Sequence, residues 1–173
     1  KDLTIKEIVP IMKLNIRGKK TEFFTNVSKI LNMILPTEAN TSSTNDKLTS
    51  IWLSPDEWMI YSNDPIENNN NSYELEESIY SNISKNNLGS ISDVTDQFVM
   101  INLEGKKIFE LLNSGSPFNF NEFKEKKGLT TQTILNHIDV IIHNKNINNV
   151  NLFVRRSFAE HLWSWMNDSA RFL

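Results

Sequence analysis

Apolar residues recur along this chain at spacings that predict the same succession of strands and helices in each half. In the first half, Thr21 to Leu35 presents one apolar helix face, and Pro36 ends the predicted helix. That face consists of Phe23, Phe24, Val27, Ile30, Leu31, Ile34 and Leu35. The other elements of this half are a strand, a hairpin closed by Ser54-Pro55-Asp56 and a second helix, predicted at Ile8 to Ile16, Lys47 to Leu53 with Glu57 to Ser62, and residues 73–86.

Polar segments separate these elements. Residues 37–47 have loop composition, and Asn68 to Ser72 reads as a polar surface loop before the second helix. Asn71 is a candidate cap of that helix because Glu74 follows three residues later. Its inward-facing residues would be Leu75, Ile79 and Ile83.

The second half starts at Ile91 and repeats this order. A strand at Phe98 to Leu103 leads into a helix at Lys106 to Asn113. The loop of residues 114–128 can pack three phenylalanines against the body, namely Phe118, Phe120 and Phe123. One or two strands are expected in Thr130 to His143, and another at Val150 to Arg155.

The last helix is predicted to begin at Ser157. The Ser157 side chain would cap it, and Glu160 would complete the capping box. One face of this helix carries Phe158, Leu162, Trp165 and Met166.

A short sequence repeat supports the similarity of the two halves. Leu14 to Lys20 matches Ile101 to Lys107, 87 positions later, with four of seven residues identical and two Leu/Ile exchanges. Each copy runs into an amphipathic helix. We therefore predict an α+β fold of two pseudo-repeated βαββα halves with antiparallel sheets, residues 1–90 and residues 91–173, in one compact unit.

Composition and charge exclude several classes of protein. The 173 residues are 39% apolar and carry a formal net charge of −3, which gives no electrostatic footprint for nucleic acid or an anionic membrane. The sequence lacks cysteine, an apolar run near 18 residues and a signal-peptide pattern. We expect a soluble protein of the bacterial cytoplasm.

The glycine pattern argues against a bound nucleotide cofactor. The five glycines are scattered, so neither a dinucleotide fingerprint nor a phosphate-binding loop can form. We expect no flavin or nicotinamide in a Rossmann domain of this chain.

Three groups of polar residues have the composition of a possible site. His137, Asp139 and His143 alternate as one strand face would, but the two histidines would lie roughly 20 Å apart, which favours a solvated face over a metal site. Capping explains Ser157 better than a nucleophile paired with His161. Two further carboxylates, Asp93 and Asp96, are more typical of turns than of an acid/base pair.

Three residues near the last helix are candidates for contact with a partner. Arg155 and Arg156 could bind an anion, but pairing with acidic groups of this protein or a neighbouring chain is favoured, since the helix dipole at that end opposes cations. Trp163 lies with Ala159 and Ala170 on a face beside the apolar one, and an exposed tryptophan is a typical interface anchor.

Four motifs, in order, resemble the gamma subunit of heterotetrameric sarcosine oxidase. Trp52 to Trp58 (WLSPDEW) is similar to that family's leucine-glycine-proline-aspartate-glutamate-tryptophan hairpin, with Ser54 in place of glycine. Val154 to Trp165 (VRRSFAEHLWSW) resembles its C-terminal signature, in which proline commonly stands at the position of Arg155. Two further motifs are also similar: Lys13 to Gly18, and Asp93 to Asp96 followed by Ile101 to Gly105, which resembles the family's central strand and glycine turn.

The resemblance implies a cofactor-free, non-catalytic subunit that stabilises a complex with alpha, beta and delta subunits. That complex would convert sarcosine, tetrahydrofolate and O2 to glycine, methylenetetrahydrofolate and H2O2. The partners would carry the cofactors: FAD and FMN on beta, NAD and the folate site on alpha, and zinc on delta.

The wider relatives implied are the folate-binding glycine-cleavage aminomethyltransferases. Their functional aspartate follows a glycine pair, whereas Leu135 to Val140 here has no glycine and only Asp139 as a carboxylate. Asp139 is therefore a weak folate candidate. Two alternatives stay open: a stand-alone folate-binding one-carbon transferase, and the equivalent subunit of a related N-methyl amino acid dehydrogenase.

Overall fold

A computed structural model describes residues 2–64 and 71–173, without the side chains of residues 71 and 72. The chain forms two units. The first unit is Pro10–Asp96, and the second unit combines Lys1–Val9 with Gln97–Leu173. Over the described residues, no helix has both the length and the apolar character needed to span a bilayer.

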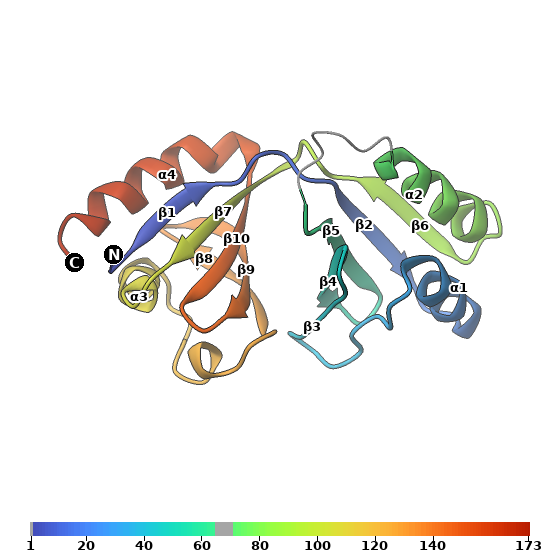
Figure 1. Cartoon of the computed structure of the whole chain (residues 1–173), viewed down its shortest axis with the longest axis horizontal. Helices are drawn as coiled ribbons and strands as arrows, with labels where there is room; N and C mark the ends of the chain where they lie inside the picture. Colours follow the sequence, from blue (N-terminus) through green and yellow to red (C-terminus); the bar gives the residue numbers. More distant parts are fainter. Residues whose placement is uncertain (1, 65–70) are drawn as a thin grey trace. The chain divides into compact units, whose positions relative to one another are not determined.

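The first unit is an antiparallel five-stranded sheet with two helices on one face (Figure 1). Its strand order is β3-β4-β5-β2-β6. The strands are β2 (Lys13–Gly18), β3 (Ser42–Thr44), β4 (Leu48–Ser54), β5 (Glu57–Ser62) and β6 (Gly89–Asp93). The helices are α1 (Thr21–Leu31) and α2 (Asn71–Ile79), which continues as a π-helical turn, η2 (Tyr80–Ser84).

The core of the first unit forms between these helices and the sheet. It contains Phe23, Val27 and Leu31 of α1, and Ile79 and Ile83 of α2 and η2, all at most 2% exposed. The strands contribute Leu14, Ile16, Trp58 and Ile60. The predicted helical spacing therefore corresponds to one buried stripe.

Helix α1 is shorter than predicted. It ends at Leu31 because Asn32 adopts the left-handed conformation (φ 50°), which asparagine tolerates and which closes a helix. Ile34, expected on the apolar face, is 79% exposed, whereas Leu35 is buried. The carbonyl of Pro36 accepts a hydrogen bond of 2.8 Å from the Trp58 indole.

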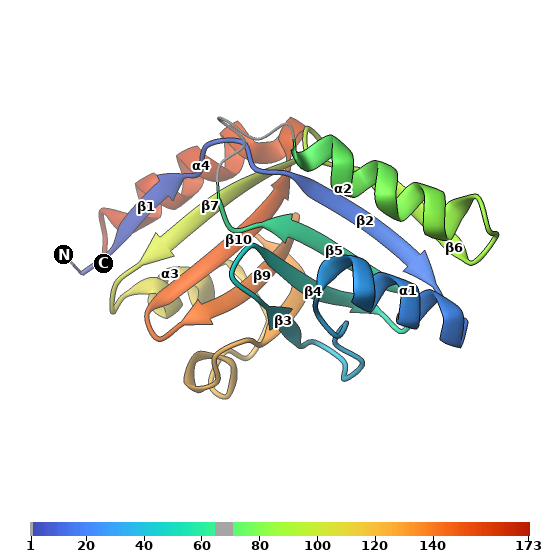
Figure 2. The same ribbon diagram turned by 45° about the vertical axis from the view of Figure 1, so that its right-hand side comes forward.

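The second unit has the same architecture (Figures 1 and 2). Its antiparallel strand order is β1-β7-β10-β9-β8. The strands are β1 (Thr4–Glu7), β7 (Phe98–Glu104), β8 (Thr130–Leu135), β9 (Ile138–Asn146) and β10 (Asn149–Arg155). The helices are α3 (Ile108–Gly115), the short 3-10 helix η3 (Phe123–Glu125) and α4 (Arg156–Ala170).

The core of the second unit lies between α3, α4 and one face of its sheet. Strand residues Leu103, Ile142 and Leu152 pack there with Leu111 and Leu162 of the helices. The loop phenylalanines also pack as predicted: Phe118, Phe120 and Phe123 contact one another with ring centroids 4.8 to 5.8 Å apart.

The two units confirm the predicted α+β class and the internal similarity. Strands β3-β4-β5-β2-β6 correspond in order to β8-β9-β10-β7-β1, with α1 equivalent to α3 and α2 to α4. The repeated glycines play the same role. The N–H of Gly18 donates to the carbonyl of Asp56 (3.1 Å), and that of Gly105 donates to the carbonyl of Asn148 (3.0 Å), each in a hairpin turn.

The strand assignment at each boundary between the halves differs from the prediction. Instead of one strand at Ile8 to Ile16, β1 pairs with β7 and β2 pairs with β5 and β6, in different sheets. The expected boundary between residues 90 and 91 falls inside β6, which pairs with β2. Each half therefore begins with a strand that joins the other half's sheet, a choice that local periodicity does not specify.

Other local differences have clear causes. Thr130 to His143 forms a hairpin whose turn residues, Asn136 and His137, both have positive φ (49° and 63°), as a tight two-residue turn requires. A short strand, β3, lies within the expected loop of residues 37–47. The start of the loop predicted at Asn68 to Ser72 lies outside the described residues, and Asn71 already begins α2.

The predicted cap of the last helix is wrong. Helix α4 begins at Arg156, and no side-chain hydrogen bond caps it. Ser157 thus lies inside the first turn. The register of the helix also leaves Phe158 50% exposed, while Leu162 and Met166 are fully buried.

Candidate functional site

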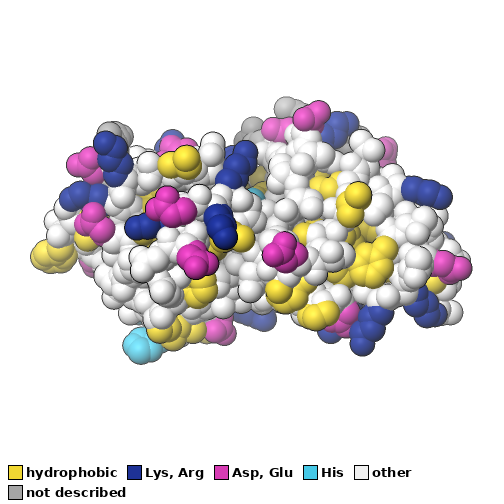
Figure 3. Space-filling model, turned by 90° about the horizontal axis from the view of Figure 1, so that it is seen from below, with side chains coloured by type: hydrophobic (Ala, Val, Ile, Leu, Met, Phe, Trp, Pro, Cys, Tyr) yellow, Lys and Arg dark blue, Asp and Glu magenta, His cyan; other side chains and the backbone are white. Residues whose placement is uncertain are grey.

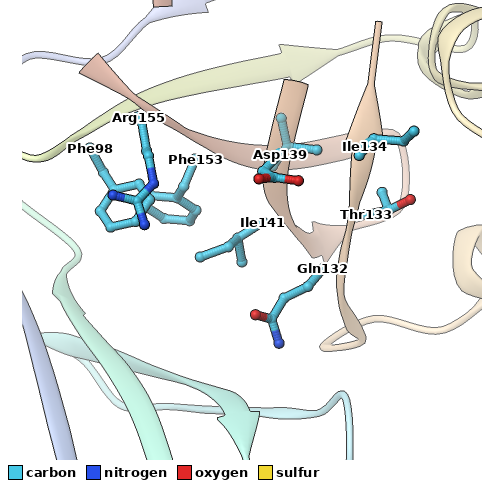
Figure 4. A pocket seen from close by; sticks show the side chains of 9 residues that line it. Phe98, Gln132, Thr133, Ile134, Asp139, Ile141, Phe153 and Arg155 are labelled. Carbon is cyan, nitrogen blue, oxygen red and sulfur yellow. The ribbon is translucent and has the colours of Figure 1, made fainter. Parts of the chain in front are cut away.

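A pocket of about 530 Å³ lies on the sheet of the second unit, among residues of β7, β8, β9 and β10 (Figure 4). It is lined by Phe98, Gln132, Thr133, Ile134, Asp139, Val140, Ile141, Phe153 and Arg155. Side chains alternate between the two faces of a strand. Since Val140 and Val154 belong to the core beneath the helices, Asp139, Ile141, Phe153 and Arg155 project from the opposite face.

Strand register brings these residues together. Across β8 and β9, Ile134 faces Asp139 and Gln132 faces Ile141. Across β9 and β10, Ile141 faces Phe153. Residues distant in sequence thereby form two adjacent rows.

Asp139 and Arg155, two of the residues singled out in the sequence, both line this pocket. They lie on neighbouring strands, one position beyond the facing pair Val154 and Val140. The Arg155 guanidinium lies over the ring of Phe98, 5.8 Å from its centroid, and not toward Asp139. Among the described residues, the structure shows no ion pair for either Asp139 or Arg155.

The two histidines considered with Asp139 lie in different settings. His137 occupies the exposed hairpin turn, whereas His143 is 3% exposed between Thr130 and Asn151 on the neighbouring strands. Burial, with a smaller effect of the Lys145 charge, lowers the pKa of His143 to about 4. Within residues 2–64 and 71–173, no three His, Cys, Asp or Glu side chains are grouped as a metal site requires.

The interface candidates Arg156 and Trp163 both belong to α4: Arg156 is its first residue, and Trp163 lies near its middle. The Arg156 side chain is exposed, and its backbone N–H donates to the carbonyl of Gln97 (2.9 Å). Trp163 is half-buried and packs against the core of the second unit, as does Trp165. The core contact accounts for much of the Trp163 surface, and its role in binding a partner stays a prediction.

Among the described residues, no hydrogen bond joins the side chains of Ser157 and His161. The His161 Nε2 atom lies 3.5 Å from Nδ2 of Asn136, in the β8–β9 turn. Asp93 organises a turn, as expected: its Oδ1 accepts a 2.8 Å hydrogen bond from the backbone N–H of Thr95.

Sequence reasoning missed Lys13, a buried lysine of the first unit. Its side-chain amine donates to the carbonyls of Ile11 and Thr95, each at 3.2 Å. Burial lowers the pKa of Lys13, and the nearby Asp96 and Asp93 carboxylates partly oppose that shift. A charged residue at the start of an apolar strand was the available signal.

A second hollow, in the first unit, gathers three cations. Arg17, Lys19 and Lys20 line it with Asp56, whose carboxylate lies 3.6 Å from Arg17 and 3.8 Å from Lys19. A hydrogen bond from Ser54 is the main cause that lowers the pKa of Asp56.

On the molecular face in Figure 3, charges of both signs are interspersed, without a broad field of one sign.

Comparison with protein families matches residues 17–171 to the sarcosine oxidase gamma subunit family. A comparison with curated proteins found no match.

Two solved structures share the fold. A chain of the heterotetrameric sarcosine oxidase from Corynebacterium sp. U-96, in complex with pyrrole 2-carboxylate, aligns with a TM-score of 0.85 at 19% identity, over 96% of this chain and 83% of that one. The glycine cleavage system aminomethyltransferase T from Bartonella henselae aligns with a TM-score of 0.64 at 12% identity, over 95% of this chain and 45% of that one. With the family match over most of its length, the chain belongs to the sarcosine oxidase gamma subunit family.

Proposed function

We propose that this chain is a non-catalytic subunit that stabilises a heterotetrameric, flavin-dependent sarcosine oxidase. The family match over residues 17–171 carries the proposal. The similarity to a chain of a heterotetrameric sarcosine oxidase, over nearly the whole of this chain, supports it.

The proposed partners are alpha, beta and delta subunits. FAD, FMN, NAD and zinc would belong to those partners, and none of them to this chain. The complex would oxidise the N-methyl group of sarcosine, transfer the one-carbon unit to tetrahydrofolate and pass electrons to O2. This subunit would contribute binding surface.

Arg155 and Arg156 are the residues we propose for contact with a partner. Both are exposed at the start of α4. Exposed arginines can pair with carboxylates in two parallel hydrogen bonds, and arginine is enriched at protein interfaces. Trp163 is a weaker probe of this idea, because its substitution would also disturb the core against which it packs.

Co-expression tests the assembly role. A tagged form of this chain, produced with alpha, beta and delta subunits, should elute with them as one species that shows flavin absorbance. Replacing Arg155 and Arg156 together by Glu should reduce recovery of the partners at least about threefold, since like charges would then meet across the interface. The same substitution at Arg171, an exposed arginine at the end of α4, is the matched control.

Two results would contradict the proposal. One is a complete and equally stable oxidase that forms without this chain. The other is a monodisperse monomer of this chain that never retains a partner. If a complex forms but oxidises another N-methyl amino acid, the subunit role stands and the substrate is that of a related dehydrogenase.

A second candidate function is folate binding through Asp139. The observation that favours it is the place of Asp139 in the lining of the pocket. Asp139 lies beside Gln132 and the apolar Ile141 in a cavity of about 530 Å³, within the usual size range of ligand sites. Tetrahydrofolate should then quench tryptophan fluorescence in a saturable way, and Asp139→Asn should abolish the effect. Absence of saturable quenching would dismiss this candidate.

A further inference from the structure

We propose that the pocket of the second unit binds a free amino acid in its zwitterionic form, with an apolar side chain. The ligand carboxylate would contact Arg155 and its ammonium group Asp139. This site is contained in one unit of the chain. Because Arg155 is also proposed for contact with a partner, ligand binding is tested on the chain alone, where no partner occupies Arg155.

The positions of the two charges carry the proposal. Strands β9 and β10 are neighbours, and Asp139 and Arg155 each lie one position beyond Val140 and Val154, the facing pair at that end of the ladder. The side chains nevertheless diverge, because Arg155 leans over Phe98, its partner on β7. Figure 4 shows the guanidinium and the carboxylate on two sides of the same pocket.

A single-charge ligand would satisfy only one side of this pocket. An anion at Arg155 would also be repelled by the negative charge of Asp139. A cation at Asp139 would be repelled by the positive charge of Arg155. A zwitterion places one charge of each sign a few ångströms apart and gains from both. The arrangement therefore selects dipolar ligands.

The remaining lining favours an apolar ligand body. Ile141 and Phe153, which face each other across β9 and β10, form the row next to the two charged side chains, and the Arg155 guanidinium lies over the Phe98 ring. Ile134, which is 37% exposed, closes the edge at β8. Since the cavity holds about 530 Å³, it has room for a branched aliphatic side chain in addition to the charged groups.

L-leucine is the probe that tests this site. Titrated into the full chain, it should cause saturable shifts of backbone amide NMR signals in β8, β9 and β10. Two analogues keep its carbon skeleton but only one charge: 4-methylpentanoate lacks the amine and 3-methylbutylamine lacks the carboxylate. Each should bind at least about threefold more weakly than leucine, as expected for loss of one partly exposed charge contact.

Substitutions locate the binding. Arg155→Met and Asp139→Asn should each weaken leucine binding at least about threefold, since each removes one of the two charges. The matched controls are Arg171→Met and Asp168→Asn, which remove an exposed Arg–Asp pair (3.6 Å) of the same unit outside the pocket. These controls should leave leucine binding unchanged.

Three results would overturn the inference: no saturable shift up to about 50 mM leucine, equal binding of leucine and a single-charge analogue, or leucine binding that neither pocket variant weakens. The co-expression experiment is read separately, by mass and flavin absorbance. A negative result in the leucine experiment therefore does not decide the assembly role, and a negative co-expression result does not decide ligand binding.

Discussion

At the scale of single residues, Lys13 and His143 are buried ionisable groups in two different settings. Lys13 keeps its amine hydrogen-bonded to two carbonyls, whereas burial shifts His143 toward its neutral form. Lys13 lies 87 positions before Met100, so the repeat offers an apolar residue at the equivalent place. The two halves therefore share a fold without sharing every buried group.

His143 should make stability depend on pH. Its pKa in the folded protein is about 4, below the ordinary value of 6.5, so the unfolded chain binds more protons between these values. The free energy of unfolding should therefore fall as the pH drops from about 6.5 to about 4, by up to about 3 kcal/mol for this group. Denaturant unfolding at several pH values measures the trend.

His143→Gln separates this contribution from that of the carboxylates. The variant should lose part of the pH dependence, whereas His137→Gln, in the exposed turn, should retain all of it. NMR titration of the His143 ring gives its pKa directly. A value near 6.5 in the folded protein would contradict the prediction.

At the scale of elements, the repeated glycines are Gly18, the last residue of β2, and Gly105, which follows β7. A side chain at these two positions would clash with different groups. A Cβ at Gly18 would lie 2.3 Å from the ring of Phe23, a core residue of α1. At Gly105, φ is 128°, and a Cβ would lie 2.3 Å from the carbonyl oxygen of Asp2. The same sequence motif thus meets a side chain in one half and backbone in the other.

Gly105→Ala should destabilise the second unit by about 2 kcal/mol or more. The substitution combines a backbone conformation that L-residues avoid with a clash against backbone, which cannot turn away as a side chain can. Chemical denaturation measures the loss. Lys106→Ala, at the exposed neighbouring position, is the control and should change the unfolding free energy by less than about 0.5 kcal/mol. Equal stability of the two variants would refute this account.

At the scale of the whole molecule, the order of elements along the chain does not coincide with the two units. Strand β1 precedes β2 in sequence but belongs to the second unit, where it pairs with β7 from Thr4–Glu104 to Glu7–Ile101. The backbone N–H of Ile8 extends this pairing to the carbonyl of Met100 (2.9 Å). Residues 4–7 are thus part of the second unit's sheet.

Deleting residues 1–7 should therefore affect the second unit more than the first. The deletion exposes the hydrogen-bonding edge of β7 and removes Leu3 and Ile5, which pack against the core of the second unit. Hydrogen exchange should accelerate in β7 at least about tenfold more than in β4. Equal protection of β7 with and without residues 1–7 would show that β1 is dispensable.

The sequence alone determined the class of fold and most of the elements. Periodicity located α1, the β4–β5 hairpin, β7, β10 and α4, because a helix or strand that buries one face must repeat its apolar residues at a fixed spacing. The repeat around Gly18 and Gly105 revealed the internal similarity. The four motifs indicate the family to which residues 17–171 belong.

The tertiary structure decided what depends on pairing between distant segments. The partners of β1 and β6 and the left-handed end of α1 at Asn32 follow from contacts that local pattern does not encode. The same holds for the pocket, since Asp139 and Arg155 are 16 positions apart and line one pocket only through the register of β9 and β10. Spacing along one strand predicts a face; the set of side chains on that face is fixed by the neighbouring strands.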